Sequence, residues 1–386
     1  MINKHLFKPR QQFKILVQSR SLATQLNPHP FTPNGPVNSS KEHKDGDIRN
    51  DWNRNDIQAI YQQPLLELVY RAASVHRMYH EPGKVQLCTL MNIKTGGCSE
   101  DCSYCSQSSR YSTGTEAGKL LALDPVIQEA KRAKNAGSTR FCMGAAWRDV
   151  GGRKRGFDRI LAMVREIKGM GMEVCTTLGM LSSEQAIALK DAGLTAYNHN
   201  LDTSREYYPE VITSRSYDDR LSTISNVRDA GISVCSGGIL GLGEQQDDRV
   251  GLIWELSRLP EHPESFPVNA LVPIKGTPLE NNTPVAVEEV VRTIATARIV
   301  MPKSIVRIAA GRKMFTDAEQ AMCFMSGANA IFSGYMLTTD GVEKDQDAEL
   351  FEKWGLQPMR PYENVEDTYE NKIQAAPSPL QQTQQA

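Results

Sequence analysis

The sequence predicts an α/β protein, a (β/α)8 barrel of TIM type with a helical lead-in at its N-terminal side and disordered tails. Eight short apolar segments of β-strand character alternate with amphipathic helical segments between residues 51 and 358, as a parallel barrel requires. A helix end of the form Asx-Ala-Gly recurs before successive strands, at Asn135 to Gly137, Asp191 to Gly193 and Asp229 to Gly231. No glycine-rich phosphate loop follows the first predicted strand, which disfavours an open dinucleotide-binding sheet.

The predicted elements follow one another without long gaps. The strands span residues 85–91, 140–143, 173–177, 196–200, 233–239, 267–271, 306–309 and 330–332. The helices span residues 56–80 as the lead-in, then 125–135, 157–170, 183–192, 217–230, 249–258, 287–300 and 316–325. Ser182 with Gln185, and Asp317 with Gln320, have the spacing of helix starts. Because barrel active sites lie at the carboxyl ends of the strands, we expect a site in the loop after the first strand.

Length and charge limit the function classes. A chain of 386 residues can bury a full core, and 44 Lys+Arg against 45 Asp+Glu gives a net charge of −1. A balanced charge does not favour nucleic acid or an anionic membrane as a partner. No apolar run approaches the length of about 20 residues that crosses a bilayer. We therefore expect no nucleic acid and no membrane among the partners.

The first 40 residues differ in composition from the rest. They contain no acid before Glu42, and hydroxyl side chains stand among apolar ones. This composition is typical of an organelle transit peptide, with a basic tail as the alternative. The predicted domains are a mitochondrial transit peptide (1–27), a linker (28–50), the barrel (51–360) and a disordered C-terminal tail (361–386). We expect the mitochondrial matrix as the location, with the cytoplasm as the alternative.

Three cysteines, Cys98, Cys102 and Cys105, lie within eight residues after the first predicted strand. Thiolates are preferred ligands of iron-sulfur clusters, and three of them can hold three irons of a cubane and leave the fourth open. A zinc knuckle needs a fourth ligand nearby, yet the next histidine is His199. A disulfide with one spare thiol does not suit a reducing compartment. The spacing therefore predicts a reactive iron-sulfur site.

This Cys-x3-Cys-x2-Cys loop, with Tyr104 just before the last cysteine, resembles the signature of the radical S-adenosylmethionine superfamily. The resemblance implies that the amino and carboxylate groups of S-adenosylmethionine bind the open iron. It also implies that an electron from a 4Fe-4S cluster cleaves this cofactor to a 5′-deoxyadenosyl radical.

Three further cysteines, Cys142, Cys175 and Cys235, lie in three different predicted strands. Each alone is interpreted as a small buried hydrophobe. Together they favour thiols that meet inside the barrel, since barrel interiors otherwise prefer Val, Ile and Leu. Cys88 in the first strand can lie near these thiols, but we interpret it as a packing residue, and Cys323 in a predicted helix likewise.

Six segments, spread over residues 51–360, resemble the biotin synthase family. They are Tyr104-Cys-Ser-Gln-Ser, Met143-Gly-Ala-Ala-Trp-Arg, Tyr197-Asn-His-Asn-Leu-Asp-Thr-Ser, Gly237-Gly-Ile-Leu-Gly-Leu-Gly-Glu, Val268-Asn-Ala-Leu-Val-Pro and Val306-Arg-Ile-Ala-Ala-Gly-Arg. The resemblance implies a homodimeric sulfurtransferase that inserts sulfur into dethiobiotin in the last step of biotin biosynthesis. It also implies an electron donor of ferredoxin or flavodoxin type and a supply of clusters from iron-sulfur assembly machinery.

The resemblance also implies residue roles. The 4Fe-4S cluster is expected on Cys98, Cys102 and Cys105, and a 2Fe-2S cluster that donates sulfur on Cys142, Cys175, Cys235 and Arg307. Asn200 and Asp202 are expected to bind the ribose of S-adenosylmethionine, with Tyr104 nearby, and Asn198 and Asn269 the ureido group of the substrate. Capping of strand-to-helix turns is the alternative for these Asn and Asp residues. Gly237, Gly238, Gly241 and Gly243 are expected to let the backbone approach the cofactor.

Arg307 is the least expected member of this set. A guanidinium is normally protonated and has no lone pair to give to iron. We therefore hypothesise that Arg307 positions the inner cluster and balances its charge, while the three cysteines hold it. A buried ion pair with a carboxylate such as Asp202 is the alternative. His199 is interpreted as structural, because radical abstraction needs no general base.

Two other functions are compatible with these motifs. One is another radical S-adenosylmethionine barrel, either a carbon-skeleton rearranging enzyme or a lipoate-type sulfur inserter. Lipoate-type enzymes resemble this chain in chemistry but carry a second cysteine cluster near a terminus, and neither end of this chain has cysteines. The other is a non-catalytic iron-sulfur or zinc protein.

Overall fold

The computed structural model describes residues 44–334 and 344–362. The predicted transit peptide lies outside the described residues, as does nearly all of the predicted C-terminal tail. The account below concerns the described part of the chain.

Parallel strands form a closed barrel, as the sequence predicts. They are β1 (Lys84–Lys94), β2 (Arg140–Ala145), β3 (Glu173–Thr177), β4 (Ala196–Asn198), β5 (Ser233–Cys235), β6 (Gly238–Leu240), β7 (Ser265–Ala270), β8 (Ile305–Ile308) and β9 (Ala330–Phe332). Strands β1 to β5 pair in order and in parallel, β5 and β6 both pair with β7, and β7 to β9 again pair in order. The pairing of β9 with β1 closes the ring. The predicted fold class is therefore confirmed.

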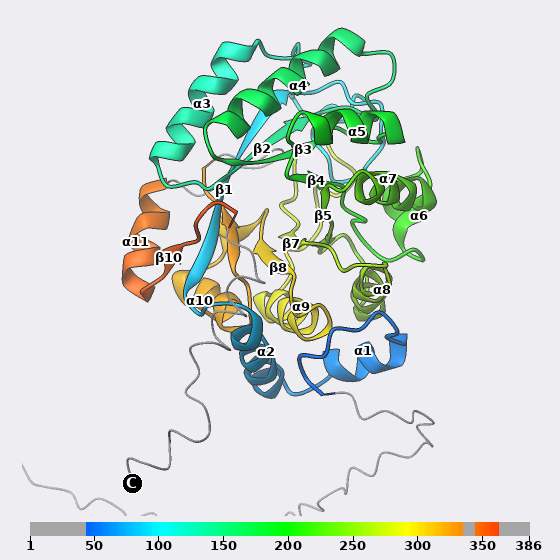
Figure 1. Ribbon diagram of the computed structural model, residues 1–386. Coiled ribbons are helices and arrows are strands. Elements are labelled where there is room, and N and C mark those ends of the chain that lie inside the picture. Colours follow the sequence, from blue (N-terminus) through cyan, green and yellow to red (C-terminus); the bar gives the residue numbers. More distant parts are fainter. Residues whose placement is uncertain (1–43, 335–343, 363–386) are drawn as a thin grey trace, which may run out of the picture. The chain divides into compact units, whose positions relative to one another are not determined.

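Helices surround this ring of strands (Figure 1). They are α1 (Arg54–Tyr61), α2 (Leu65–Tyr79), α3 (Leu123–Asn135), α4 (Lys154–Gly169), α5 (Ser183–Asp191), α6 (Tyr208–Val211), α7 (Tyr217–Asp229), α8 (Gln246–Ser257), α9 (Val287–Val300), α10 (Asp317–Met325) and α11 (Lys344–Trp354). Their inward faces bury apolar side chains, for example Ile160, Val164 and Ile167 of α4, against the strands. This burial is the main favourable contribution to the stability of such a fold.

Four details differ from the sequence prediction. The lead-in helix is broken into α1 and α2 because Pro64, which caps α2, lacks the N–H that a continuous helix needs. The fifth strand is divided into β5 and β6. Helix α10 is capped by Thr316 in a box with Glu319, and not by the predicted pair of Asp317 and Gln320. Helices α6 and α11 and the short strand β10 (Gln357–Pro358), which pairs with the start of β1, were not predicted.

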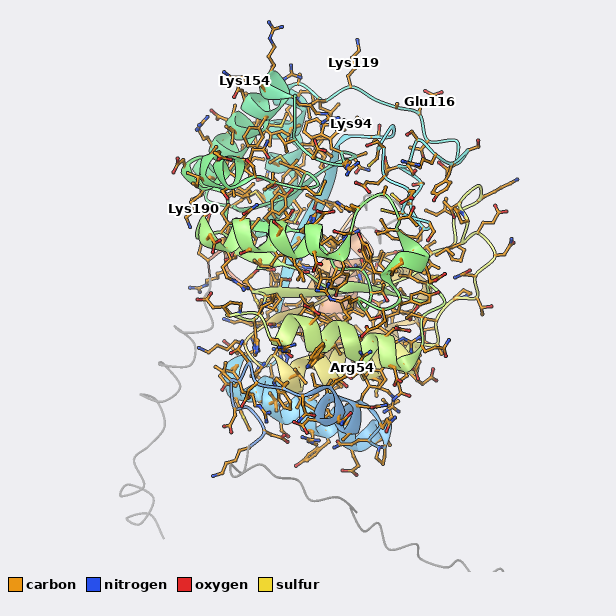
Figure 2. The ribbon with its side chains drawn as sticks, turned by 90° about the vertical axis from the view of Figure 1, so that its right-hand side faces the viewer. Arg54, Lys94, Glu116, Lys119, Lys154 and Lys190 are labelled. Atoms are coloured by element: carbon orange, nitrogen blue, oxygen red, sulfur yellow. The ribbon has the colours of Figure 1, made fainter. Side chains whose placement is uncertain are left out.

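None of the helices in the two described ranges is long and apolar enough to cross a bilayer. Figure 2 shows Lys119 and Lys154 extending outward from the body of the protein. Both residues are exposed.

The interior at the amino ends of the strands is charged. Arg140 of β2 donates to Glu173 of β3 at 2.6 Å and to both carboxylate oxygens of Glu264 at 2.8 and 3.1 Å. Gln86 of β1 donates to the same Glu173 and accepts from Arg307 of β8 at 2.7 Å. One connected polar network therefore spans β1, β2, β3 and β8 at the base of the barrel.

Replacement of Arg140 tests this network. Arg140→Leu leaves Glu173 without its cation in a place where only 7% of its side chain is exposed. Removing one partner of a buried pair destabilises proteins by about 3–5 kcal/mol. We expect a loss of that size in the free energy of unfolding, measured by chemical denaturation.

The matched control is Arg132→Leu, which breaks an ion pair with Glu129 in which the arginine side chain is 70% exposed. Exposed pairs contribute about 0–1 kcal/mol. Equal losses in the two variants would contradict the importance of the buried network.

Candidate active site

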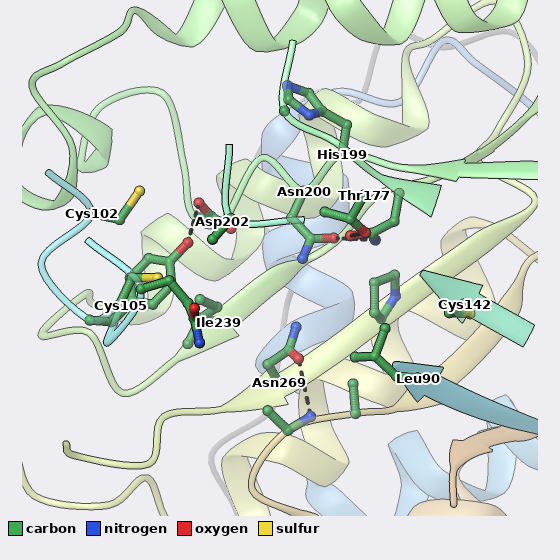
Figure 3. A pocket seen from close by; sticks show the side chains of 18 of the residues that line it. Leu90, Cys102, Cys105, Cys142, Thr177, His199, Asn200, Asp202, Ile239 and Asn269 are labelled. Carbon is green, nitrogen blue, oxygen red and sulfur yellow. Dashed lines mark hydrogen bonds between the residues drawn. The ribbon is translucent and has the colours of Figure 1, made fainter. Parts of the chain in front are cut away.

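A pocket of about 240 Å³ lies at the carboxyl ends of the barrel strands. Every site residue that the sequence predicts lines this one pocket. They are Cys98, Cys102, Tyr104, Cys105, Cys142, Cys175, Asn198, Asn200, Asp202, Cys235, Asn269 and Arg307. Figure 3 shows Cys102 and Cys105 on one side and Cys142 on the other, with Asn200, Ile239 and Asn269 between them. The two groups of thiols therefore face one pocket from different ends.

The loop of the first cysteine group is held by its own backbone. The amide of Cys98 donates to the carbonyl of Gln107 at 3.0 Å, and the amide of Cys105 donates to that of Cys102 at 3.0 Å. Gly96 and Gly97, which open the loop, have positive φ angles of 61° and 68°. A side chain at Gly96 would also place its Cβ 2.5 Å from the carbonyl oxygen of Glu116, so only glycine fits there.

Asp101 attaches the loop to the segment before α7. Its Oδ1 accepts from the amides of Thr213 and Ser214, each at 3.0 Å, and its carboxylate also accepts from both hydroxyls. Partial burial raises the pKa of Asp101, but the hydrogen bonds from Thr213 and Ser214 outweigh it and lower this pKa. The ionised carboxylate therefore holds the cysteine loop in place.

Burial dominates the protonation of the loop thiols. It raises the pKa of Cys102 to about 12 and that of Cys105 to about 11. The pKa of Cys98 is raised for the same reason. Without a metal these groups are protonated at neutral pH, and a bound metal would have to displace their protons.

The second cysteine group lies deeper, inside the barrel. Cys142 of β2 and Cys175 of β3 are adjacent in register and are in contact. The thiol of Cys235 of β5 instead accepts a hydrogen bond from the side chain of Asn198 at 3.4 Å. Burial raises the pKa of Cys235 to about 11. The structure thus brings the three predicted thiols to one pocket but joins only two of them directly.

Cys88 of β1 joins this group, which the interpretation as a packing residue missed. It is fully buried, interacts with Cys142 and belongs to one buried cluster with Cys142 and Cys175. Arg307 donates to its sulfur. Burial opposes ionisation, but the hydrogen bond from Cys142 and the charges of Arg307 and Arg140 lower the pKa of Cys88 to about 6. Cys323 in α10, by contrast, lies in the apolar core, as expected.

Asp202 is the centre of the polar wall between the two groups. Tyr104 donates to its carboxylate at 2.9 Å, and Arg220 of α7 pairs with it at 2.6 Å. The open alternative that Asp202 pairs with Arg307 is therefore wrong, because Arg220 occupies that role. Asp202 also has a positive φ of 69°, an unfavourable backbone conformation of the kind that occurs at functional sites.

Three amide side chains complete this wall. Asn198 accepts from Thr177 at 3.2 Å and donates to Asn200 at 3.1 Å. Asn269 donates to the carbonyl of Gly238 at 2.9 Å. It accepts from the amide of Ala310 at 3.1 Å, the dashed line beside Asn269 in Figure 3. An amide group has two donor hydrogens and two acceptor lone pairs. Asn269 therefore keeps one donor and one acceptor for a ligand.

Gly237 and Gly238 lie where parts of the barrel pack closely against one another. A Cβ on Gly237 would lie 2.0 Å from the carbonyl oxygen of Pro267, and one on Gly238 would lie 2.3 Å from Leu252 and 2.6 Å from the carbonyl oxygen of Asp202. These glycines allow neighbouring strands and helix α8 to approach one another. Their expected role toward the cofactor stays a prediction.

Besides Arg140, described above, the sequence interpretation missed two arginines that line the pocket, Arg215 and Arg220. Both arginines come shortly after the segment that contains Asp202, and this position in the sequence could have indicated them. Arg215 and Arg148 face the buried carboxylate of Glu100, at 3.8 and 3.3 Å, next to the cysteine loop. Burial, together with Arg215 and Arg220, lowers the pKa of His199 well below its usual value. His199 is therefore neutral, as a structural role requires.

The donor sets fit iron-sulfur clusters by their chemistry. Within the two described ranges, no three Cys, His, Asp or Glu side chains stand grouped as an ion would need. Cluster binding therefore requires thiols to turn toward a common point. All six predicted cysteines line the same pocket, and soft thiolates at this density select iron or zinc over harder metal ions.

Comparisons with known proteins agree with this site. Residues 92–253 match the family described as the Radical SAM superfamily, and residues 267–357 match the Biotin and Thiamin Synthesis associated domain. The fold and the site thus define a barrel enzyme of the radical S-adenosylmethionine superfamily.

Curated relatives identify the family within this superfamily. The chain is 62% identical to the mitochondrial biotin synthase of Emericella nidulans over 316 residues, 82% of this chain and 80% of that protein. It is 61% identical to the mitochondrial biotin synthase of Arabidopsis thaliana, over 83% of this chain and 85% of that protein. The protein belongs to the biotin synthase family.

Solved structures support the fold. Methylornithine synthase superposes with a TM-score of 0.68 at 18% identity, over 80% of this chain and 94% of that one. A maturase of the [FeFe]-hydrogenase, HydG, gives the same TM-score at 16% identity, over 79% of this chain and 72% of that one. At this identity the similarity shows the shared fold alone.

The attachment of the cysteine loop gives a prediction. Asp101→Ala removes the acceptor for the amides of Thr213 and Ser214, whereas Asp101→Asn keeps an oxygen that can accept from both. A hydrogen bond contributes about 0.5–1.5 kcal/mol, so we expect exchange of these two amides to become roughly two- to tenfold faster in the alanine variant. Hydrogen exchange followed by mass spectrometry measures this. Unchanged exchange in Asp101→Ala would show that the loop is held by other contacts.

Proposed function

We propose that this protein is a biotin synthase, which inserts sulfur into dethiobiotin by a radical reaction and so completes biotin biosynthesis. The observation that carries the proposal is the pair of thiol groups at different ends of one pocket, in a chain 62% identical to a curated biotin synthase. One group suits a radical generator and the other a sulfur donor. The polar wall between them suits the cofactor and the substrate.

Cys98, Cys102 and Cys105 would hold the 4Fe-4S cluster. When bound, this cluster supplies the electron that cleaves S-adenosylmethionine to the radical that abstracts hydrogen from the substrate. Asn200 and Asp202 would accept hydrogen bonds from the ribose hydroxyls, since amide and carboxylate oxygens are acceptors. Tyr104 and Arg220 fix the Asp202 carboxylate so that it already points along the pocket wall. This preorganisation reduces the ordering that binding requires.

Cys142, Cys175, Cys235 and Arg307 would hold the 2Fe-2S cluster. When bound, this cluster supplies the sulfur that enters the product. Its ligands lie on strands β2, β3, β5 and β8, so the barrel itself fixes their positions. A pocket that confines the substrate between the two thiol groups makes the substrate radical meet sulfur before it meets solvent.

Asn198 and Asn269 would bind the ureido group of dethiobiotin. A ureido group offers two N–H donors and one carbonyl acceptor, and Asn269 keeps one donor and one acceptor unused. Leu90, Ile239 and Phe332 add apolar surface to the same pocket. The pocket therefore suits a small molecule with one polar ring and an aliphatic part.

The proposal extends to the partners and the location. Such an enzyme needs a one-electron donor of ferredoxin or flavodoxin type, iron-sulfur assembly machinery to load its clusters, and a second copy for the homodimer. The mitochondrial location is supported by the names of the relatives from Emericella nidulans, Arabidopsis thaliana and Saccharomyces cerevisiae.

The decisive experiment is anaerobic incubation with dethiobiotin, S-adenosylmethionine and a reductant, followed by product analysis. Biotin together with 5′-deoxyadenosine supports the proposal. Deoxyadenosine without biotin would favour another radical barrel, and a colourless protein after reconstitution would favour a zinc protein. An electron carrier would be coloured but would not cleave the cofactor.

Replacement of Cys102 tests the outer cluster. With Cys102→Ala only two thiolates remain in the loop, so we expect no detectable cleavage of S-adenosylmethionine and loss of about four irons per chain. Iron analysis and chromatography of 5′-deoxyadenosine measure both. Cys323→Ala, which removes a buried thiol of α10 outside the pocket, is the matched control and should keep both. Retained cleavage in Cys102→Ala would refute the assignment.

Deletion of residues 1–27 tests the location. If this segment is a transit peptide, the truncated protein keeps its activity in solution but stays in the cytosol. Fluorescence microscopy of tagged full-length and truncated proteins measures the difference. Import of the truncated protein into mitochondria would contradict the prediction.

A further inference from the structure

A short segment near the end of the described chain crosses the amino end of the barrel. Residues 357–362 (the strap) begin with β10, which pairs in parallel with the first residues of β1. The amide of Met359 donates to the carbonyl of Val85 at 3.0 Å. The side chain of Met359 is buried in a small apolar cluster with Ile305 and Ala330, the first residues of β8 and β9. The strap therefore covers the starts of three neighbouring strands.

Tyr362 fastens the other end of the strap to β3. Its amide donates to Oε1 of Glu173, the first residue of β3, at 2.7 Å, and its hydroxyl donates to the carbonyl of Met172 at 2.7 Å. The ammonium group of Lys168 lies 4.0 Å from the centre of the Tyr362 ring and donates to the same hydroxyl at 2.8 Å. Hydrogen bonds and a cation–π contact thus hold the strap at this point.

The base network that Tyr362 joins lies one layer below the inner thiols, which are those of Cys88, Cys142, Cys175 and Cys235. On β1, β2 and β3, a polar side chain of this network precedes a buried cysteine by two residues. The pairs are Gln86 with Cys88, Arg140 with Cys142, and Glu173 with Cys175. Side chains two residues apart in a strand point to the same face and stand about 7 Å apart. Arg140 lines the pocket, so the pocket reaches down to this layer.

Glu173 connects the strap to the layer under the thiols. Its Oε2 accepts from Arg140 at 2.6 Å and from Gln86 at 3.2 Å, whereas its Oε1 accepts from the amide of Tyr362. The two oxygens of this carboxylate are therefore bonded from different sides. When the strap leaves, water can take the place of the Tyr362 amide at Oε1, because a carboxylate oxygen accepts from either donor.

Two features favour opening of the strap. Tyr362 has a positive φ of 58°, a conformation that residues other than glycine rarely adopt and that the contacts of Tyr362 must maintain. Apart from Met359, residues 357–361 are exposed, so separation of the strap uncovers little apolar surface. Local contacts of low cost therefore hold the strap, as in segments that open without unfolding of the whole domain.

We propose that the strap closes the amino end of the barrel and opens as a second entrance, through which iron and sulfide reach the inner thiols. This inference rests on the proposed function, in which the inner site gives up sulfur and has to be filled again. From the carboxyl end, ions must pass the outer cysteine loop, which lies across the pocket from Cys142 (Figure 3). From the amino end they meet polar side chains, which can replace part of the water shell of an ion where an apolar core cannot.

The first test labels the full chain without metal with N-ethylmaleimide and follows each cysteine by mass spectrometry. Tyr362→Ala removes the ring and the hydroxyl bonds of the strap but keeps its backbone amide. We expect Cys142 and Cys175 to be labelled about two- to tenfold faster in this variant, the factor that corresponds to one lost hydrogen bond. Cys98 of the outer loop and Cys323 of the apolar core should keep their wild-type rates.

The matched control is Tyr70→Ala, which truncates a tyrosine of α2 that is 72% exposed and lies outside the strap. Unchanged labelling of the inner thiols in Tyr362→Ala would overturn the proposal. An equal increase at Cys323 would show a general loosening of the barrel and would overturn it as well. If Tyr362→Ala does not fold, Met359→Ala removes the buried side chain of the strap by a different change, and the same rates decide.

The second test uses the reconstituted enzyme with dethiobiotin and S-adenosylmethionine but without a reductant, so that the pocket is filled from the carboxyl end and no turnover occurs. EDTA then removes iron, and the signal of the 2Fe-2S cluster is followed. We expect its loss to be about two- to tenfold faster in Tyr362→Ala than in the wild type. Equal rates would contradict a second entrance. The labelling test needs neither cluster nor substrate, so its result is independent of whether the proposed function holds.

Discussion

The ion pairs of Arg140 with Glu173 and Glu264 are the constraint on which the rest of this barrel depends. A parallel barrel normally fills its interior with branched aliphatic side chains. Here thiols, amides and arginines occupy the interior, so the apolar core lies between the strands and the outer helices. A buried charge is tolerated only when it is paired and hydrogen-bonded. Arg140 and Gln86 both donate hydrogen bonds to Glu173, and these bonds close the base of the barrel. Gln86 also accepts a hydrogen bond from Arg307, which fixes the position of the Arg307 side chain.

The two thiol groups differ in how the chain positions them. The outer group belongs to one loop, and its place depends on a few hydrogen bonds, above all those of Asp101 to Thr213 and Ser214. The inner group belongs to separate strands of a closed sheet, so its spacing is set by strand register. A loop can adjust to the loading of a cluster, while strands resist movement. This difference suits the roles proposed above, an outer site that works repeatedly and an inner site that holds sulfur in one place beside the substrate.

Asp202 links these two ends. Its carboxylate joins Tyr104 of the cysteine loop to Arg220 of α7, and its backbone pairs with the segment that begins β6. The positive φ of Asp202 turns the chain so that the carboxylate faces the pocket. Loss of this residue would therefore affect the loop, the pocket wall and the fifth strand together, beyond any direct contact with a cofactor.

The sequence by itself determined the repeating strand and helix pattern, the two cysteine groups and the position of the site at the carboxyl ends of the strands. These features are local, since hydrophobic periodicity, glycine helix ends and ligand spacing are read from neighbours in the chain. The tertiary structure alone decided that Cys88 joins the inner thiols, that Asp202 pairs with Arg220 and not Arg307, and that Arg215 faces Glu100. Each of these depends on which side chains meet across the barrel. Strand register and the inward direction of each residue set those meetings, and no local pattern encodes them.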